Sequence, residues 1–277
     1  MMPAPRIATG LVPGLLAGLL LWAAPAQALV SGKTGRVSVA YEEPKDPAHK
    51  PILEKLKQAR VLEMLRDHFN RIRLPKPLVL KVAGCDGEIN AWYEPEEGTI
   101  TTCYEYLAYL GEVRARVPAK GIAAGLDPSA AVIGPFLEVF VHELSHALFD
   151  LLKLPILGRE EDAADQLAAY TLLKLGTEQA RKAVAGVAFM YATEAKDETP
   201  KLKDYADVHG TSAQRFFNLL CLAYGKDPKA FAEAVTQKLL PEDRAEGCAD
   251  EYAQVDYAYR TLLAPYVTKP QQRDGRR

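Results

Sequence analysis

The stretch Val141-His142-Glu143-Leu144-Ser145-His146-Ala147 decides both the fold and the chemistry that this sequence predicts. It places His-Glu-x-x-His inside a long apolar run that favours a buried helix. At about 3.6 residues per turn, the two histidines lie about 40° apart on one face and roughly 6 Å apart along the axis, so both imidazoles can bind one zinc ion. Glu143 lies roughly 100° round from His142 and can act as general base on a zinc-bound water, whose pKa the metal lowers.

The alternative interpretation of this stretch is a buried helix with two hydrogen-bonded histidines and a surface glutamate. The chain has only 5 histidines in 277 residues. A chance occurrence of His-Glu-x-x-His is therefore rare, on the order of one in a hundred for this composition. The motif consequently favours a metal site.

The composition is that of an ordinary globular protein. Hydrophobic residues make up 48% of the chain and charged residues 25%, and the formal net charge is −2. Because there is no basic stripe and no interleaving of basic and aromatic residues, the sequence predicts no nucleic-acid partner. We expect a signal peptide over residues 1–28, one domain over residues 29–265 and a disordered polar tail over residues 266–277.

The first segment of the chain has the features of a secretory signal peptide. Arg6 is its only charged residue, and residues 7–24 are apolar. Ala26-Gln27-Ala28 has small residues at the −3 and −1 positions of a cleavage site, so we expect cleavage before Leu29. An uncleaved membrane anchor is the alternative, because a run of about 18 apolar residues is near the lower limit for spanning. With cleavage, the sequence predicts an exported protein with no stable membrane span.

All cysteines lie in the exported part of the chain, at Cys85, Cys103, Cys221 and Cys248. An even number of cysteines in an exported protein indicates disulfides. Four cysteines allow three pairings. We favour Cys85–Cys103 and Cys221–Cys248, because each pair closes a local loop within one predicted structural unit. The sequence contains no Cys-x-x-Cys, which disfavours a thiolate zinc site.

Strand patterns come first along the chain and helix patterns follow. The predicted strands share alternating or continuous apolar residues and lie at residues 36–42, 78–83, 88–93 and 99–104. The predicted helices share apolar residues at helical spacing and lie at residues 52–69, 104–113, 128–153, 160–175, 178–192, 212–224, 228–239 and 249–263. Turn residues 94–98 join the last two strands as a hairpin. This order favours an α+β fold with a small, mostly antiparallel N-terminal sheet and a helical C-terminal part that carries the motif.

A catalytic zinc ion normally has three protein ligands, and we expect the third on the helix that follows the motif. A turn of about five residues brings the helix at residues 160–175 back beside the motif helix. Glu161 and Asp165 are four residues apart and share a face of this helix. We therefore assign Glu161 as the third ligand, and Asp165 as the acceptor for the second ring nitrogen of a ligand histidine.

The acids at the start of this helix also have a second explanation. Glu160, Glu161 and Asp162 are all favoured at a helix N-terminus by the helix dipole. The dipole does not decide which acid turns inward, so Glu160 remains an alternative third ligand. Asp150 is a further candidate for a contact with a ligand histidine.

Taken together, these residues resemble the zincin superfamily in its glutamate-ligand branch. The resemblance rests on His142-Glu143-Leu144-Ser145-His146 followed by Glu161-Asp162-Ala163-Ala164-Asp165-Gln166-Leu167-Ala168. The segments that resemble a narrower family of exported bacterial metallopeptidases of unknown function are residues 90–93, 142–152, 157–169 and 214–221. The resemblance covers roughly residues 36–260. It implies a zincin-like fold, a Zn²⁺ cofactor and a peptide or protein substrate, and it names no particular substrate.

Asn90-Ala91-Trp92-Tyr93 also resembles the substrate-binding edge strand of thermolysin-like peptidases. The resemblance implies that an extended peptide adds to this edge through backbone groups of Asn90 or Ala91. The alternative is an ordinary hairpin strand with two packed aromatic residues. In thermolysin-like enzymes a downstream histidine helps to stabilise the oxyanion, and His209 is the candidate for that role, although it could equally cap a loop. Gln214 and Arg215 are predicted to be structural or rim residues.

The sequence thus leads to one main hypothesis and two alternatives. The main hypothesis is a bacterial zinc metallopeptidase, periplasmic or secreted, in which His142, His146 and Glu161 hold zinc and Glu143 activates the zinc-bound water. One alternative is a non-catalytic zinc protein of the cell envelope that binds a partner. The other is a zinc hydrolase of a non-peptide amide in the cell wall. Glu143 argues against the first alternative, because a structural zinc site needs no general base.

Overall fold

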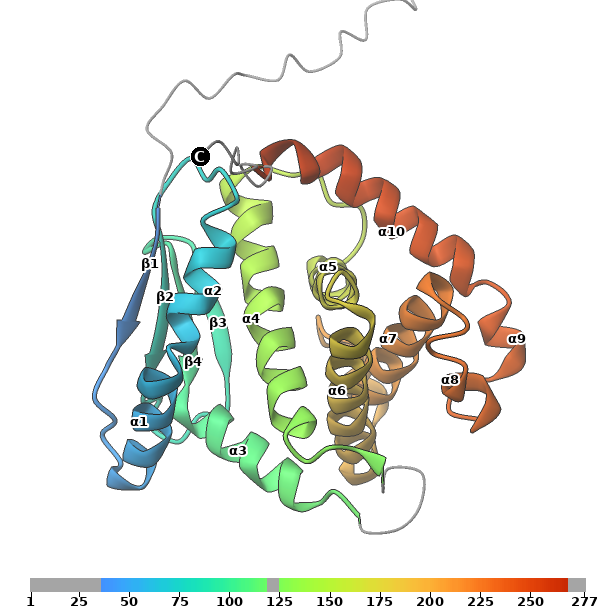
Figure 1. Ribbon diagram of the computed structural model, residues 1–277, viewed down its shortest axis with the longest axis horizontal. Helices are drawn as coiled ribbons and strands as arrows, with labels where there is room; N and C mark the ends of the chain where they lie inside the picture. The colour runs from blue at the N-terminus through green and yellow to red at the C-terminus, as the bar shows by residue number, and fades with distance from the viewer. Residues whose placement is uncertain (1–35, 119–124, 269–277) are drawn as a thin grey trace, which may run out of the picture. The chain divides into compact units, whose positions relative to one another are not determined.

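The computed structural model describes residues 36–118 and 125–268 of the chain. These residues belong to one compact unit, residues 33–277. The predicted signal peptide and residues 269–277 of the predicted tail lie outside the described residues. Within the unit, the long helix α4 lies between a sheet on one side and a layer of helices on the other (Figure 1).

Four strands form a mixed sheet in the order β1-β2-β4-β3. The strands are β1 (Val37–Tyr41), β2 (Leu78–Ala83), β3 (Ala91–Glu94) and β4 (Thr99–Cys103). β1 pairs with β2 in parallel, β2 pairs with β4 in parallel, and β3 pairs with β4 antiparallel. The α+β class is confirmed, and the β3–β4 hairpin is present as predicted. The expectation of a mostly antiparallel sheet is wrong, because two of the three pairings in the described residues are parallel.

The parallel pairing follows from the connection between β1 and β2. This connection holds η1 (Pro47–His49), α1 (Lys50–Ala59) and α2 (Val61–Phe69). A crossover of this length returns the chain to the same end of the sheet, so the next strand runs parallel. The single helix predicted over residues 52–69 is two helices, because Arg60 takes a left-handed φ of 53° between them.

One face of the sheet forms a core with helices α2 and α4. Leu80 and Ile100 are paired in register and fully buried on this face. Tyr41 of β1 donates a hydrogen bond to Glu63 of α2 at 2.9 Å. At the other edge, α4 packs against β3 and β4. The edge strand β3 is therefore fixed beside α4.

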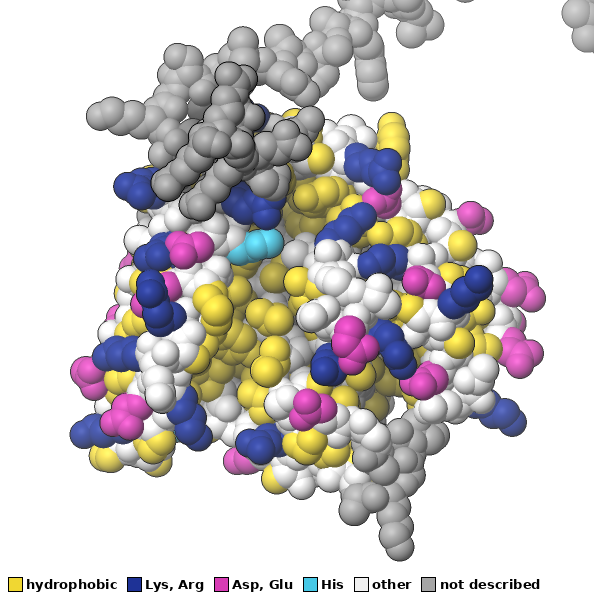
Figure 2. Space-filling view, viewed as in Figure 1, with side chains coloured by type: hydrophobic (Ala, Val, Ile, Leu, Met, Phe, Trp, Pro, Cys, Tyr) yellow, Lys and Arg dark blue, Asp and Glu magenta, His cyan; other side chains and the backbone are white. Residues whose placement is uncertain are grey.

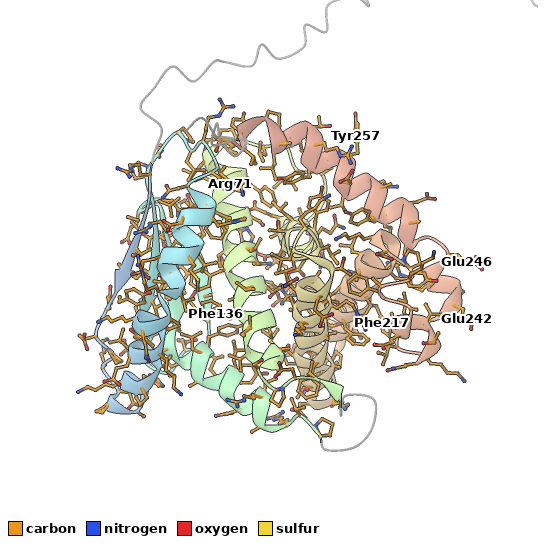
Figure 3. All side chains as sticks on the ribbon, in the orientation of Figure 1. Arg71, Phe136, Phe217, Glu242, Glu246 and Tyr257 are labelled. Atoms are coloured by element: carbon orange, nitrogen blue, oxygen red, sulfur yellow. A yellow bond between two sulfur atoms is a disulfide. The ribbon has the colours of Figure 1, made fainter. Side chains whose placement is uncertain are left out.

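Helix α4 (Ala130–Leu151) is the centre of the unit. It packs against α3 (Tyr104–Ala115), α5 (Glu160–Leu173) and α6 (Thr177–Asp197). By length and composition it could cross a membrane, but 67% of its apolar window is buried inside the protein, as in the core helix of a globular domain. The rings of Phe136 and Phe140 pack 4.9 Å apart between centroids on this helix. Figure 3 labels Phe136 on α4. Figure 2 shows apolar side chains gathered in a hollow over α4.

The remaining helices cover the far side of α5 and α6. They are η3 (Leu202–Ala206), α7 (Ser212–Lys226), α8 (Glu233–Thr236), α9 (Glu242–Ala245), α10 (Cys248–Leu262) and η4 (Ala264–Tyr266). The helix predicted over residues 228–239 is reduced to the single turn α8. Asp227 accepts hydrogen bonds from the amides of Lys229 and Ala230 and forms a turn there, and Lys238 takes a left-handed φ of 58°.

Residues 266–268, which we expected in the disordered tail, are part of the fold. The carbonyl of Tyr266 accepts a hydrogen bond from the amide of Arg73 at 2.9 Å, and the amide of Thr268 donates to the carbonyl of Arg71 at 2.7 Å. Val267 forms an antiparallel bridge with Ile72. These bonds hold the end of the described chain against the segment that follows α2.

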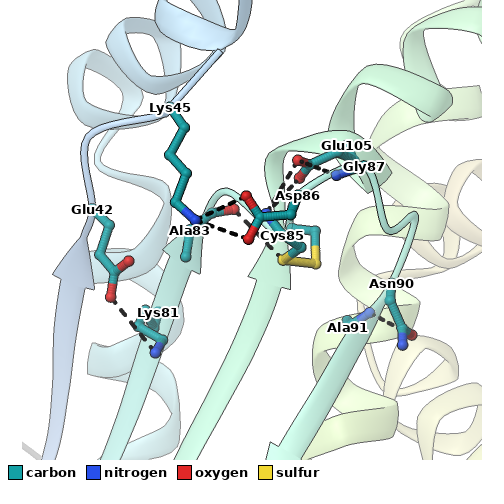
Figure 4. Close-up of a disulfide and its surroundings, with 11 residues drawn as sticks. Glu42, Lys45, Lys81, Ala83, Cys85, Asp86, Gly87, Asn90, Ala91 and Glu105 are labelled. Carbon is teal, nitrogen blue, oxygen red and sulfur yellow. Dashed lines mark hydrogen bonds and ion pairs between the residues drawn. A yellow bond between two sulfur atoms is a disulfide. The ribbon is translucent and has the colours of Figure 1, made fainter.

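Both favoured disulfides are present, as Cys85–Cys103 and Cys221–Cys248. The first joins the loop after β2 to the end of β4 (Figure 4). Glu105 of α3 also holds this loop, because its carboxylate accepts hydrogen bonds from the loop amides of Cys85 at 3.1 Å and Gly87 at 3.2 Å. A covalent bond and charge-assisted hydrogen bonds therefore anchor the loop that leads into β3.

Helices α4 and α6 cross at close range because glycines lie at the contact. A Cβ on Gly186 would lie 1.9 Å from the carbonyl oxygen of Ala130. A Cβ on Gly134 would lie 2.4 Å from the carbonyl oxygen of Ala183. Backbone atoms cannot yield at such distances without moving a whole helix, so a larger residue at either glycine would push the two helices apart.

Gly186→Ala should therefore lower the free energy of unfolding by about 1–3 kcal/mol, the usual effect of overpacking. Gly111→Ala is the matched control. Gly111 also lies inside a helix, but a Cβ there meets nothing within 4 Å. The better helix propensity of alanine should raise stability by roughly 0.5–1 kcal/mol at that position. Urea denaturation measures both changes, and equal effects of the two substitutions would contradict the close crossing.

Candidate metal centre

Three side chains from two neighbouring helices converge on one point. His142 and His146 come from α4, and Glu161 lies in the first turn of α5. The Nε2 atoms of the two histidines are 3.2 Å apart. Oε2 of Glu161 lies 3.1 Å from Nε2 of His142 and 3.2 Å from Nε2 of His146. The three atoms form a nearly equilateral triangle.

This triangle fits one face of a tetrahedral metal site. Ligand atoms bound at about 2.0–2.1 Å to a tetrahedral ion are roughly 3.3 Å apart. Two imidazole nitrogens that face each other cannot both point an N–H at the other, whereas a cation between them satisfies both lone pairs. The side chains of His146 and Glu161 remain 14% and 20% exposed. The residues can therefore hold one metal ion and leave a fourth position within reach of water or substrate.

The second ring nitrogens of both histidines also face carboxylates. Oδ1 of Asp165 lies 2.8 Å from Nδ1 of His142, at an angle that departs from a straight hydrogen bond. Oε1 of Glu160 lies 2.8 Å from Nδ1 of His146. Such contacts decide which ring nitrogen is left for a metal. Glu161 thus faces both Nε2 atoms, whereas Glu160, the alternative third ligand, lies behind His146.

Glu143 lies on the side of α4 that faces β3. Its residue is 7% exposed. This burial raises the pKa of Glu143 to about 6, although His142 and His146 act in the opposite direction. The backbone N–H of Tyr93 in β3 also acts to lower this pKa. A buried carboxylate with a pKa close to neutrality has the properties of a general base.

Without a metal ion, protons and carboxylates stabilise the triangle. Burial lowers the pKa of His142, but its close contacts with the carboxylates of Asp165 and Glu161 outweigh burial and raise the pKa to about 10. Glu161 and Glu160 likewise outweigh burial and raise the pKa of His146. Hydrogen bonds from three histidines hold the pKa of Glu161 well below its usual range. A metal ion that enters at neutral pH must therefore displace protons.

His209 reaches the same carboxylate from the loop before α7. Its Nε2 lies 3.0 Å from Oε2 of Glu161, and its Nδ1 lies 3.2 Å from Oδ1 of Asp207. The ring stacks beside that of His142, with 6.4 Å between centroids. Its side chain is 50% exposed. His209 therefore has both features that the sequence left open: a loop contact, to Asp207, and a place at the accessible side of the triangle.

The edge strand β3 presents only part of the backbone that we expected for substrate. The carbonyl of Asn90 accepts a hydrogen bond from Cys103 in the sheet at 3.0 Å. The side chain of Asn90 accepts from the amide of Ala91 at 2.9 Å. Backbone groups alternate in direction along a strand, so Ala91 and Tyr93 point away from β4, toward the free edge. The expectation for the Asn90 carbonyl is therefore wrong, and the carbonyl of Ala91 is the group that faces outward.

Asp150, a further candidate from the sequence, does not contact a ligand histidine. Its carboxylate accepts a hydrogen bond from the hydroxyl of Tyr93 at 2.9 Å and pairs with Lys153 at 2.7 Å. This contact links α4 to the strand that carries Tyr93. Asp150 therefore helps to hold β3 beside the triangle.

Three residues behind the triangle had no functional role in the sequence-based hypothesis. Nε of Arg215 donates to Asp165 at 2.8 Å, and the hydroxyl of Tyr191 donates to Glu138 at 2.8 Å. Glu138 carries a local signal, because it lies one helical turn before His142 on the polar side of the motif helix. Arg215 and Tyr191 come from α7 and α6, and no local pattern links either to the motif. Of the two alternatives given for Arg215, a structural or a rim residue, its contact with Asp165 favours the structural one.

Comparison with known proteins identifies one family. A family model described as "Putative metallopeptidase" matches residues 41–263. The match spans the elements from α1 to α10 and includes the whole triangle. Among curated proteins and solved structures, none matches the chain. The family supports a metal-dependent peptidase and leaves the metal and the mechanism unspecified.

The two neighbouring glutamates should differ sharply in their effect on metal binding. Glu161→Ala removes a donor from the triangle and should abolish stoichiometric metal binding. Glu160→Ala leaves all three donors in place and removes a contact to one ligand, so it should weaken binding by about 10–100-fold. Metal content after purification and competition with a chelator measure both effects. The reverse order of the two variants would make Glu160 the ligand.

Metal affinity should also increase with pH between about 6 and 8. The pKa of His142 is raised to about 10 in the metal-free site. Its proton is therefore present throughout this range and must leave when the metal binds. Each proton released changes the affinity about tenfold per pH unit. Calorimetric titrations in buffers of different ionisation enthalpy count the released protons, and a count of zero would contradict this protonation state.

Proposed function

The chain belongs to the family described as "Putative metallopeptidase", whose family model matches residues 41–263. On that premise we propose that the protein is a zinc-dependent metallopeptidase. In this proposal His142, His146 and Glu161 hold the zinc ion, and Glu143 is the general base. The observation that carries the proposal is the triangle of donor atoms at 3.1–3.2 Å with a buried carboxylate beside it. Two histidines, one glutamate and a nearby carboxylate base match one known form of hydrolytic zinc site.

The donor set favours zinc in a catalytic rather than a structural role. Two histidines and one glutamate are a known set of protein ligands for catalytic zinc, with water or substrate at the fourth position. When bound, the ion would polarise a peptide carbonyl and lower the pKa of water. A structural zinc site is usually closed by four protein ligands and needs no general base. The proposal therefore prefers an enzyme to a zinc-containing binding protein.

Glu143 moves the proton in the proposed reaction. Its carboxylate takes a proton from the attacking water and then gives it to the amine that leaves. A pKa raised to about 6 keeps both the charged and the protonated form accessible near neutral pH. The strand that would bind the substrate packs against α4, the helix that carries the base.

His209 and β3 supply the remaining contacts to substrate in this proposal. Nε2 of His209 would donate a hydrogen bond to the negative charge that develops on the carbonyl oxygen of the substrate. Glu161 at Nε2 and Asp207 at Nδ1 raise the pKa of His209 and so favour the imidazolium form, in which both ring nitrogens, Nε2 included, carry a proton. An extended peptide would lie along the free edge of β3, with the backbone of Ala91 as a hydrogen-bond partner.

The proposed substrates are peptides or proteins outside the cytoplasm. The family supports peptide or protein substrates in general. The disulfides Cys85–Cys103 and Cys221–Cys248 are stable in an oxidising compartment. Together with the predicted signal peptide, they support a periplasmic or secreted location.

Glu143→Gln tests the proposed mechanism directly. Glutamine has nearly the same shape but cannot accept a proton, so hydrolysis should fall by about 10²–10⁴-fold while one zinc ion per chain is retained. Cleavage of an unbiased peptide library, followed by mass spectrometry, measures the loss. Glu178→Gln on the surface of α6 is the matched control and should keep full activity.

Two outcomes of this experiment would overturn the proposal. If Glu143→Gln cleaves peptides as fast as the natural chain, Glu143 is not the base. If the zinc-loaded natural chain cleaves no peptide, the peptidase assignment fails, and cleavage of cell-wall amides by the same preparation would redirect the substrate class.

A further inference from the structure

Arg215 is an almost buried cation that the proposed reaction does not use. It projects from α7 between α4, α5 and α6, and its side chain is 22% exposed. It contacts the carboxylates of Asp165 and Glu138 and the ring of Tyr191. A charge held in such surroundings is expensive unless each partner is well placed. These well-placed contacts indicate that Arg215 has a specific role in this part of the protein.

One side of the guanidinium binds the carboxylate of Asp165. Its Nε donates to Oδ2 at 2.8 Å, and a terminal nitrogen donates to Oδ1 at 2.5 Å. A bidentate pair of this kind fixes both the position and the rotation of a carboxylate. Oδ1 is also the atom that lies 2.8 Å from Nδ1 of His142. The orientation that Arg215 imposes on Asp165 is thus the orientation that meets His142.

The other side of the guanidinium is held by α4 and α6. The same terminal nitrogen lies 3.4 Å from Oε1 of Glu138, which also accepts the hydroxyl of Tyr191 at 2.8 Å. The ring of Tyr191 lies beneath the guanidinium, 4.7 Å from its central carbon to the ring centroid. Cation–π contact and the second carboxylate prevent the guanidinium from turning away from Asp165.

We propose that Arg215 is a positioning residue for the metal centre. It holds Asp165 against Nδ1 of His142 and thereby keeps Nε2 of His142 directed at the triangle. The inference rests on the metal site of the proposed function. Arg215 acts through Asp165, so it requires no contact with the metal ion or with the substrate. Its role is to restrict rotation of the His142 imidazole, which helix α4 alone would leave free to rotate.

Zinc affinity of Arg215 variants, measured by competition with a chromophoric chelator, tests this role. Arg215→Met removes the charge and should raise the dissociation constant for Zn²⁺ by about 10–100-fold. Arg215→Lys keeps the charge but cannot donate a bidentate pair of hydrogen bonds. Its zinc affinity should therefore lie between that of Arg215→Met and that of the natural chain. If Arg215→Met does not fold, the zinc dissociation constant of Arg215→Lys alone tests the proposal. In both variants the absorption spectrum of bound Co²⁺ should change, because the geometry at His142 is loosened.

A double-mutant cycle separates positioning from a general structural role. Asp165→Asn should weaken zinc binding about as much as Arg215→Met. If Arg215 acts through Asp165, Arg215→Lys should add less than about twofold in the Asp165→Asn background, against about tenfold in the natural background. Fully additive effects in the two backgrounds would overturn the proposal, because they would mean that the residues act independently.

Arg159→Met is the matched control. Arg159, the residue before α5, forms a comparable pair with Asp162 of α5, with bonds of 2.8 Å and 3.0 Å. Neither residue contacts a histidine of the triangle, so zinc affinity should be unchanged. If the Arg215 variants bind zinc as tightly as the natural chain, the positioning role is refuted and the proposed peptidase stands. If the natural chain itself binds no zinc, the proposed function fails and this inference fails with it.

Discussion

The whole site depends on one carboxylate oxygen that reaches two imidazoles. Oε2 of Glu161 lies within 3.2 Å of Nε2 on both His142 and His146. The two histidines are brought together by the geometry of a single helix, whereas the third donor must come from another element. Helix α5 therefore has to begin beside α4, with Glu161 in its first turn facing the two histidines. The close crossing of α4 and α6 through Gly134 and Gly186 supports α4 from another side.

This constraint concentrates acids around two histidines, and the charges must be balanced. Glu160 and Asp165 contact the outer nitrogens of the same rings that Glu161 contacts at Nε2. In the metal-free protein, protons on the histidines supply the positive charge, as their raised pKa values indicate. Arg215 adds a permanent cation behind Asp165. Glu143 lies apart from this balance, in a buried place next to β3 that raises its pKa toward neutrality.

Local features of this protein could be predicted from the sequence, and long-range ones could not. Helical spacing alone brings His142 and His146 to one face, and a spacing of four does the same for Glu161 and Asp165. Strand order depends on pairing between distant segments. The hairpin was therefore predictable, but the insertion of β4 beside β2, which makes the sheet mainly parallel, was not. Arg215 could be predicted only as a structural or rim residue, because no local pattern connects it to a carboxylate 50 residues earlier in the chain.

The most direct test of this account is the position of zinc in a crystal of the zinc-loaded protein, located by anomalous scattering at the zinc absorption edge. The account predicts one strong peak per chain, about 2.0–2.2 Å from Nε2 of His142, Nε2 of His146 and a carboxylate oxygen of Glu161. A peak at Glu160 and Nδ1 of His146, or a crystal grown with zinc that shows no peak at the triangle, would contradict it.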